Sequence, residues 1–162
     1  LARKINIKSY TSIFVLSYIG NFIGAIIIAA LYAYSGLEDG SSTKLITSIT
    51  HAKTSMPILT LFLGGMLCNI LICLAILFSI KMKNEAAKII MISWCLFAFI
   101  TTGYEHCIVN MILFSSERML TSTILPVLSI VYNLFWVTFG NIVGGSIIGI
   151  THYYLGKKDN QS

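Results

Sequence analysis

The stretch FITTGYEHCIVN (Phe99–Asn110) sets a glutamate beside a histidine within a long apolar run of the sequence. That run, Ala86–Phe114, is longer than the roughly 20 residues with which a helix crosses a membrane. Within it, the glycine weakens a helix, and the two threonines can bond to nearby backbone groups. We therefore predict two half-helices, joined near residues 101–106 by a short link that protein buries or water lines.

Long apolar runs place the whole chain among membrane proteins. Of its 162 residues, 56% are hydrophobic and 10% are charged, whereas about 25% of the residues of a soluble domain are charged. A helix rises about 1.5 Å per residue, and the hydrocarbon core of a membrane is about 30 Å thick. The first run is too long for a signal peptide. Four runs are predicted to span the membrane: Tyr10–Gly36, Met56–Ile80, Ala86–Phe114 with its break, and Pro126–Leu155.

The net charge of +5 is spread over the segments between the predicted spans, which argues against a nucleic-acid partner. Cytoplasmic segments of membrane proteins are enriched in lysine and arginine. We therefore predict that both ends of this chain and the 81–88 segment are cytoplasmic, and that the loops Leu37–Ser55 and Ser115–Leu125 face outward. The basic residues of the cytoplasmic segments are Arg3, Lys4, Lys8, Lys81, Lys83, Lys88, Lys157 and Lys158.

One pattern, G-N-x-x-G followed by a small residue, occurs twice, at Gly20–Ala25 in the first predicted span and at Gly140–Gly145 in the last. The glycines allow helices to approach closely, and the amides of Asn21 and Asn141 need partners inside a membrane. A single copy would indicate ordinary helix packing, but two copies in spans of opposite direction indicate an inverted repeat. Because an interrupted span precedes the second copy alone, we expect an upstream part with two further spans, one of them broken.

The two ionisable side chains of the interrupted span are candidates for function. Such groups at membrane depth are costly, and they face a partner, a cavity or a pathway. For His106 we favour a functional role over a hydrogen bond that merely joins two helices. For Glu105 we favour a structural role, because a buried carboxylate needs a cation or several donors. Lys53 is the best candidate for that cation, and Asn69 for an additional donor.

Residues for other kinds of chemistry do not gather in this sequence. The three histidines are far apart, and the four cysteines lie inside predicted spans without zinc-type spacing. We therefore expect no metal, no cofactor and no enzymatic activity. Two alternatives remain open at this point. One is an anchor subunit of a respiratory complex, which requires haem-ligating histidines on facing spans, and the other is a membrane-embedded enzyme with Glu105 and His106 as acid and base.

Two segments resemble a known family. Tyr104–Met111 resembles the F/Y-E-H-x-x-x-N-M signature of the formate/nitrite transporter family, and Phe135–Gly145 is similar to the last helix of that family. Lys53, which precedes a helix that starts after a proline, also fits a lysine position of the family. The resemblance implies an all-α membrane protein with an aquaporin-like inverted repeat of six spans. It implies that this chain supplies the third to sixth spans, with the fifth helix interrupted.

The resemblance also implies partners and roles. It suggests a homopentamer in a bacterial plasma membrane, with one pore per protomer that passes small monovalent anions. Hydrosulfide is the preferred candidate, since the likeness is strongest to the hydrosulfide channels of clostridia, and formate and nitrite are the others. The pore would be lined by His106 at its centre, Phe99 at a constriction, Ile72 at the outer constriction and Lys53 as an attracting charge. The supporting polar network would comprise Glu105, Asn69, Asn110, Asn21 and Asn141.

Overall fold

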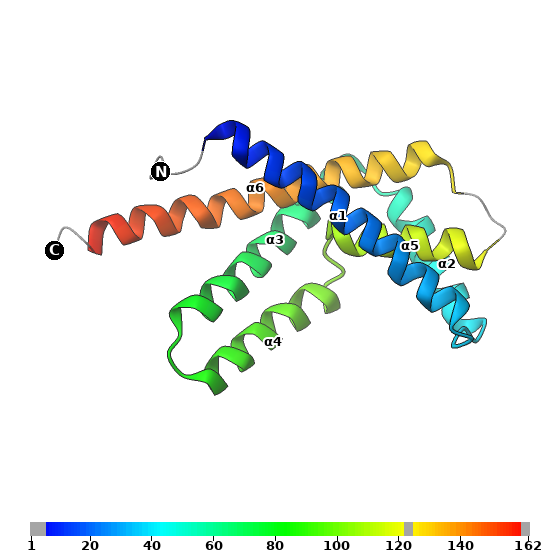
Figure 1. The fold of residues 1–162 in the computed structure, drawn as a ribbon, viewed down its shortest axis with the longest axis horizontal. Helices are drawn as coiled ribbons and strands as arrows, with labels where there is room; N and C mark the ends of the chain where they lie inside the picture. Colours follow the sequence, from blue (N-terminus) through cyan, green and yellow to red (C-terminus); the bar gives the residue numbers. More distant parts are fainter. Residues whose placement is uncertain (1–5, 122–124, 160–162) are drawn as a thin grey trace. The chain divides into compact units, whose positions relative to one another are not determined.

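The computed structural model describes residues 6–121 and 125–159 of the chain, and every regular element in those ranges is a helix. The predicted all-α class is thus confirmed. Arg3, Lys4 and residues 122–124 of the predicted outer loop lie outside the described residues, and so do the side chains of Lys157 and Lys158. The helices are α1 (Ile7–Tyr34), α2 (Ser41–Thr54), α3 (Ile58–Lys81), α4 (Glu85–Thr101), α5 (Cys107–Leu120) and α6 (Val127–Asp159) (Figure 1).

The helices divide between two compact units. The first unit comprises Leu1–Met56 and Ile108–Leu134, and the second comprises Pro57–Cys107 and Phe135–Ser162. The first unit therefore holds α1, α2, nearly all of α5 and the start of α6. The second unit holds α3, α4, the link after α4 and the rest of α6.

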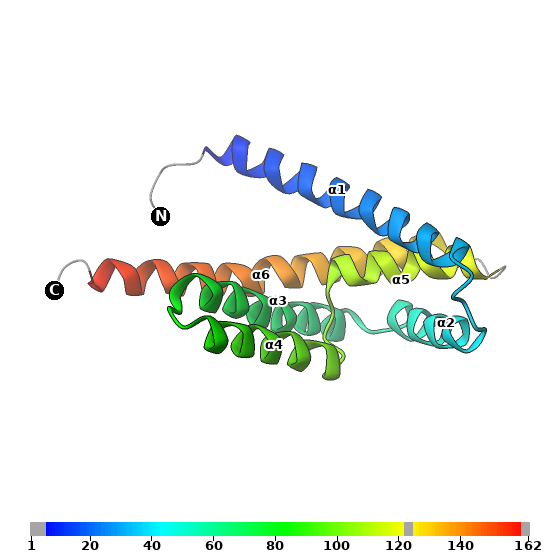
Figure 2. The same cartoon turned by 60° about the horizontal axis from the view of Figure 1, so that its bottom comes forward.

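Within the second unit, α3 and α4 form an antiparallel hairpin, visible in both Figure 1 and Figure 2. Pro57 is extended before the first turn of α3, as its fixed φ and missing amide proton allow. Asn84 caps α4, because its side-chain oxygen accepts from the amide of Ala87 at 3.1 Å. Glu85 then lies in the first turn, where a negative charge suits the helix dipole.

In the part of the chain that the structure describes, three helices are long and apolar enough to cross a membrane: Lys8–Tyr34 of α1, Ile58–Lys81 of α3 and Val127–Gly156 of α6. The fourth predicted span, Ala86–Phe114, is instead made of two shorter helices, α4 with 17 residues and α5 with 14. Neither half alone reaches the roughly 20 residues that a crossing requires.

The two segments that were predicted as outer loops are helical over much of their length. The segment Leu37–Ser55 contains the 14-residue helix α2. This helix starts because Gly40 turns the chain with a φ of +68°, and because the Asp39 carboxylate accepts from the Ser42 amide at 2.8 Å. The same hydrogen bond, from the Ser42 amide, holds the pKa of the exposed Asp39 carboxyl below its usual value. We predicted a loop because this segment is polar, whereas Asp39 and Gly40 start a helix in it.

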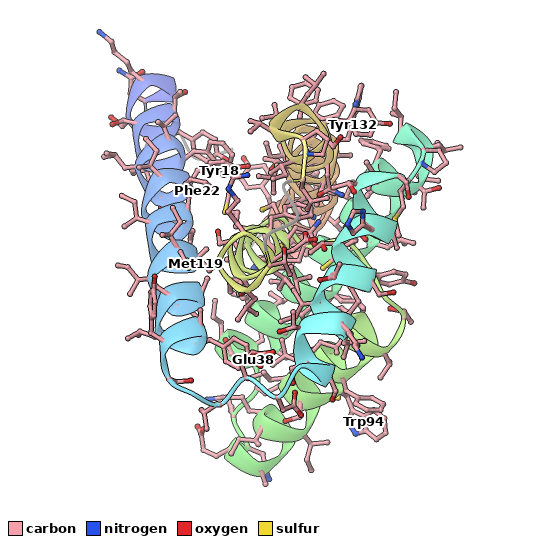
Figure 3. The ribbon with its side chains drawn as sticks, turned by 90° about the vertical axis from the view of Figure 1, so that its right-hand side faces the viewer. Tyr18, Phe22, Glu38, Trp94, Met119 and Tyr132 are labelled. Carbon is pink, nitrogen blue, oxygen red and sulfur yellow. The ribbon has the colours of Figure 1, made fainter. Side chains whose placement is uncertain are left out.

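The second predicted outer loop, Ser115–Leu125, is also helical over its first half, because α5 continues to Leu120. Glu117 and Arg118, which were assigned to a loop by their charge, are both good helix formers. Glu117 is 1% exposed, so its charge does not mark a solvated segment. Figure 3 shows α5 beside α1 in the first unit, where Met119 and Phe22 line one apolar cavity.

Candidate functional site

The chain breaks between α4 and α5. The helix α4 ends at Thr101, the hydroxyl of Thr102 donates back to the carbonyl of Ala98 at 2.7 Å, and Gly103 follows with a φ of +69°. That left-handed conformation is one that glycine adopts readily and that other residues adopt at a cost. Tyr104, Glu105 and His106 are non-helical, and α5 starts at Cys107. The predicted interruption of this helix is confirmed.

Asn141 of α6 holds both sides of this break. Its side-chain oxygen accepts from the amide of Cys107 at 3.1 Å, and its side-chain nitrogen donates to the carbonyl of Glu105 at 3.0 Å. The same nitrogen also donates to the carbonyl of Gly65 in α3 at 2.8 Å. The first amide groups of a helix have no partner within it. One side chain, 6% exposed, thus satisfies an amide that starts α5 and two carbonyls outside it.

The glycines beside Asn141 let α6 lie against the backbone of α3. A methyl carbon at Gly140 would lie 2.2 Å from the carbonyl oxygen of Phe62, and one at Gly144 would lie 2.2 Å from that of Met66. Both distances are far below van der Waals contact. Only glycine therefore permits this approach, which brings Asn141 within reach of Gly65.

Asn69 of α3 joins the same group. Its side-chain nitrogen donates to the main-chain carbonyl of Asn141 at 2.5 Å. The sequence suggested Asn69 as a donor beside Glu105. In the structure, the side-chain amide of Asn69 instead donates to Asn141. Its place in a supporting polar network remains a prediction.

Phe99, near the end of α4, and His106, at the end of the link, bring their rings together. Their ring centroids are 6.2 Å apart, with 39° between the ring planes. His106 is half-buried, and among the described residues its ring nitrogen Nδ1 is buried without a hydrogen-bond partner. The ring therefore keeps a polar atom available beside an aromatic face.

Glu105 is 2% exposed, and its main chain is fixed at both ends. Its amide donates to the carbonyl of Gly64 at 3.3 Å, and its carbonyl accepts from Asn141. A methyl carbon at Gly64 would stand 3.2 Å from Cγ of Glu105, so the side chain packs on the α3 backbone. Ile72, the predicted outer constriction, is half-buried further along α3.

A second polar group lies in the first unit. The side-chain nitrogen of Asn110 in α5 donates to the side-chain oxygen of Asn133 in α6 at 2.9 Å. The side-chain nitrogen of Asn133 donates in turn to the main-chain carbonyl of Lys53 at 2.9 Å, near the end of α2. Both asparagines are 0% exposed. Two predicted residues, Lys53 and Asn110, are thus joined through Asn133, which the sequence analysis missed.

The sequence analysis also missed the burial of Glu117. This residue is 1% exposed, its carboxylate oxygens make no hydrogen bond among the described residues, and Nε2 of His51 lies 3.5 Å from one of them.

Asn21, a predicted member of the supporting network, is exposed and donates to the carbonyl of Ser17 in its own helix at 2.8 Å. Over residues 6–121 and 125–159, no group of three or more His, Cys, Asp or Glu side chains could hold a metal ion.

Long apolar helices, one of them broken at an ionisable link, define a multi-span membrane protein of the kind used for transport. The family model described as Formate/nitrite transporter matches residues 1–155, and the chain belongs to this family. The resemblance to this family found in the sequence is thereby confirmed. Membership also favours transport over the two alternatives, a respiratory-complex anchor and a membrane-embedded enzyme.

Relatives and solved structures agree with this assignment. The chain is 41% identical over 151 residues to the nitrite transporter NirC of Escherichia coli, covering 90% of this chain and 55% of that protein. It is 31% identical over 165 residues to the formate channel FocA of Haemophilus influenzae, covering 88% and 58%. Thus the chain spans little more than half the length of these relatives.

Two solved structures have the same fold. One is described as an FNT family ion channel, with a TM-score of 0.81 and 35% identity over 95% of this chain and 63% of the other. The second is described as a pentameric formate channel with formate bound, with a TM-score of 0.79 and 29% identity over 94% and 68%.

Proposed function

We propose that this chain forms part of a membrane channel for small monovalent anions, with hydrosulfide as the preferred substrate. The observation that carries the proposal is the link at Gly103–His106, where a histidine with an available ring nitrogen lies beside an aromatic ring. Formate and nitrite are the alternatives, supported by relatives that are named as nitrite transporters and formate channels. The proposed function is transport and includes no enzymatic activity.

Phe99 is the proposed barrier to the anion. Removing water from a bare ion is costly, so an apolar constriction opposes its passage. A positive charge offsets part of that cost by drawing anions inward, and Lys53 is the proposed source. The start of α5 adds positive potential beside His106, as helix N-termini do. Ile72 is proposed to form the outer constriction.

His106 is the proposed central donor. A ring nitrogen can hold an anion by a hydrogen bond, or it can pass a proton so that the neutral acid crosses the barrier. The unperturbed pKa of histidine, about 6.5, makes both protonation states accessible near neutral pH. Glu105 is buried next to it in the chain and, with Lys53, is proposed to set the balance between these states.

The proposed assembly is a homopentamer in a bacterial plasma membrane, with both ends of this chain in the cytoplasm. Its support is the likeness to a structure described as a pentameric formate channel. The topology rests on the charge pattern of the segments between the spans. The supporting network of the pore is proposed to include Asn21, Asn69, Asn110 and Asn141.

Competitive flux in proteoliposomes tests the function. The purified protein, in the assembly in which the cell makes it, is given hydrosulfide, formate and nitrite in pairs. We expect each anion to reduce the flux of the others, with hydrosulfide favoured. Transport of none of the three would contradict the proposal, and a clear preference for nitrite or formate would replace the preferred substrate.

A substitution at the barrier adds a second test. Phe99→Ile removes the ring beside His106 and is expected to raise flux. Phe97→Ile is the matched control, because Phe97 lies on the same helix and is 58% exposed. Flux that stays the same or falls in Phe99→Ile would argue against the barrier.

A further inference from the structure

Asn133 lies fully buried in the long apolar helix α6, and both polar atoms of its side-chain amide form hydrogen bonds. Its oxygen accepts from Asn110 and its nitrogen donates to the main-chain carbonyl of Lys53, both at 2.9 Å. A buried amide with these two partners cannot turn over without placing a donor against a donor. The relay therefore has one direction, from α5 through α6 to the end of α2.

The carbonyl that Asn133 binds lies in the last turn of α2, which ends at Thr54. Carbonyls in the last turn of a helix are open to groups from outside the helix. Asn133 supplies such a group to the carbonyl of Lys53. A neighbouring bond supports the same junction, because the hydroxyl of Tyr132 donates to the carbonyl of Met56 at 3.4 Å.

The other end of the relay lies close to the break along the chain. Asn110 is in the first turn of α5, which starts directly after His106. A path of two hydrogen bonds thus runs from the first turn of α5 through Asn133 to the main-chain carbonyl of Lys53. Side chains that belong to one hydrogen-bond network respond to substitution as a unit.

We propose that Asn133 is a positioning residue, which fixes the attracting charge of Lys53 through the main chain at the end of α2. The inference rests on the proposed function of Lys53 and adds a residue to it. Asn133 does not touch the anion. It holds in place the backbone from which the lysine side chain extends.

Flux at graded anion concentrations, measured in proteoliposomes for hydrosulfide, formate and nitrite in parallel, tests this role. Lys53→Gln is expected to raise the half-saturating concentration about tenfold, at the lower end of the effect of charge on local ion concentration. Asn133→Leu is expected to raise it about fivefold, which corresponds to the loss of one hydrogen bond of about 1 kcal/mol. The double variant is expected to resemble Lys53→Gln alone, because no charge is left to position.

The control is Ser146→Ala, which removes from the same helix a hydroxyl that bonds to its own carbonyl of Ile142 at 2.7 Å. It is expected to leave the half-saturating concentration unchanged. A merely structural Asn133 would change the yield of assembled protein and the maximal flux, and leave the half-saturating concentration as it is. Asn133→Ala serves as a second variant if Asn133→Leu fails to assemble.

Three results from the Asn133 variants would overturn the inference. One is an unchanged half-saturating concentration in Asn133→Leu where Lys53→Gln raises it, which leaves the proposed function intact. Another is a double variant in which the two effects multiply. The third is failure of both Asn133 variants to assemble, since Asn133 then supports the whole fold. If Lys53→Gln itself has no effect, the attracting role of Lys53 falls and the inference falls with it.

Discussion

Asn21 and Asn141 occupy the same position in two copies of one motif, and their surroundings differ. Asn141 binds three main-chain groups, those of Gly65, Glu105 and Cys107. Asn21 donates to Ser17 within its own helix. The glycines differ in the same way, because a methyl carbon would clash with backbone at Gly140 and would meet no atom of this chain within 4 Å at Gly20.

The difference shows what the motif supplies and what it does not. A glycine pair lets two helices approach, and an asparagine between them offers a donor and an acceptor at close range. In α6, Asn141 binds both sides of the break, because a broken helix presents main-chain groups that lack helical partners. In α1, the amide of Asn21 bonds instead to a carbonyl of its own helix.

The largest expected effect is that of Asn141→Leu. The substitution leaves the amide of Cys107 and the carbonyls of Gly65 and Glu105 without this partner, at about 1–3 kcal/mol for each buried group. We expect a loss of roughly 4 kcal/mol or more in the free energy of unfolding, measured by thermal unfolding in detergent.

Asn21→Leu is the matched variant in the other copy. It removes one exposed bond within a helix, so we expect a change below about 0.5 kcal/mol. Equal losses in the two variants would contradict the difference between the copies.

Substitution of the glycines is expected to have the next largest effect. Gly140→Ala places a methyl group against the carbonyl of Phe62, and overpacking of this kind costs about 1–3 kcal/mol. Gly20→Ala is expected to cost nothing measurable or to stabilise slightly, because alanine favours a helix over glycine. The measurement is the same thermal unfolding. A loss in Gly20→Ala as large as in Gly140→Ala would show that a segment outside this chain packs on α1.

The smallest expected effects concern two pairs of ionisable side chains that differ in burial, one in each unit. His51→Leu removes the imidazole beside the buried carboxylate of Glu117, in the first unit. Because His51 is half-exposed, we expect a loss of only about 1 kcal/mol. In the second unit, Lys88 and Glu85 form an exposed pair at 2.8 Å, and Lys88→Leu is expected to cost less than about 0.5 kcal/mol.

The variant Glu117→Gln completes this test. It removes the buried charge, so adding His51→Leu to it is expected to cost nothing further. Chemical unfolding of the single and double variants measures this coupling. Losses that simply add would show that the two side chains do not interact.

The sequence predicted the break because its causes are local. Gly103 and the threonines before it weaken a helix wherever they stand, and two ionisable side chains beside them are costly in an ordinary span. The partners of Asn141 could not be predicted in this way, because they depend on which backbone lies across the helix interface. Asn133 was overlooked for the same reason, although an asparagine among the apolar residues of α6 is a signal that could have identified it.

The errors in the sequence analysis have a common cause. The helix α2 and the end of α5 are rich in polar residues, and polar segments between spans were taken for loops. Asp39 and Gly40 instead start a helix, and Glu117 is turned inward. Composition reports the average surroundings of a segment, whereas hydrogen bonds of single side chains decide where its helices begin.

The most direct test of the central claim is the pH dependence of formate flux in His106→Asn. Formate suits the test because a simple carboxylate with a pKa near 4 stays an anion between about pH 5 and pH 8. Asparagine keeps a hydrogen-bond donor and loses the titrating ring, and His152→Asn is the control. If His106 gives the proton, wild-type flux rises as pH falls from about 8 to about 5, and His106→Asn flattens this rise while the protein still assembles. An unchanged pH response in His106→Asn would contradict the proton-donor role.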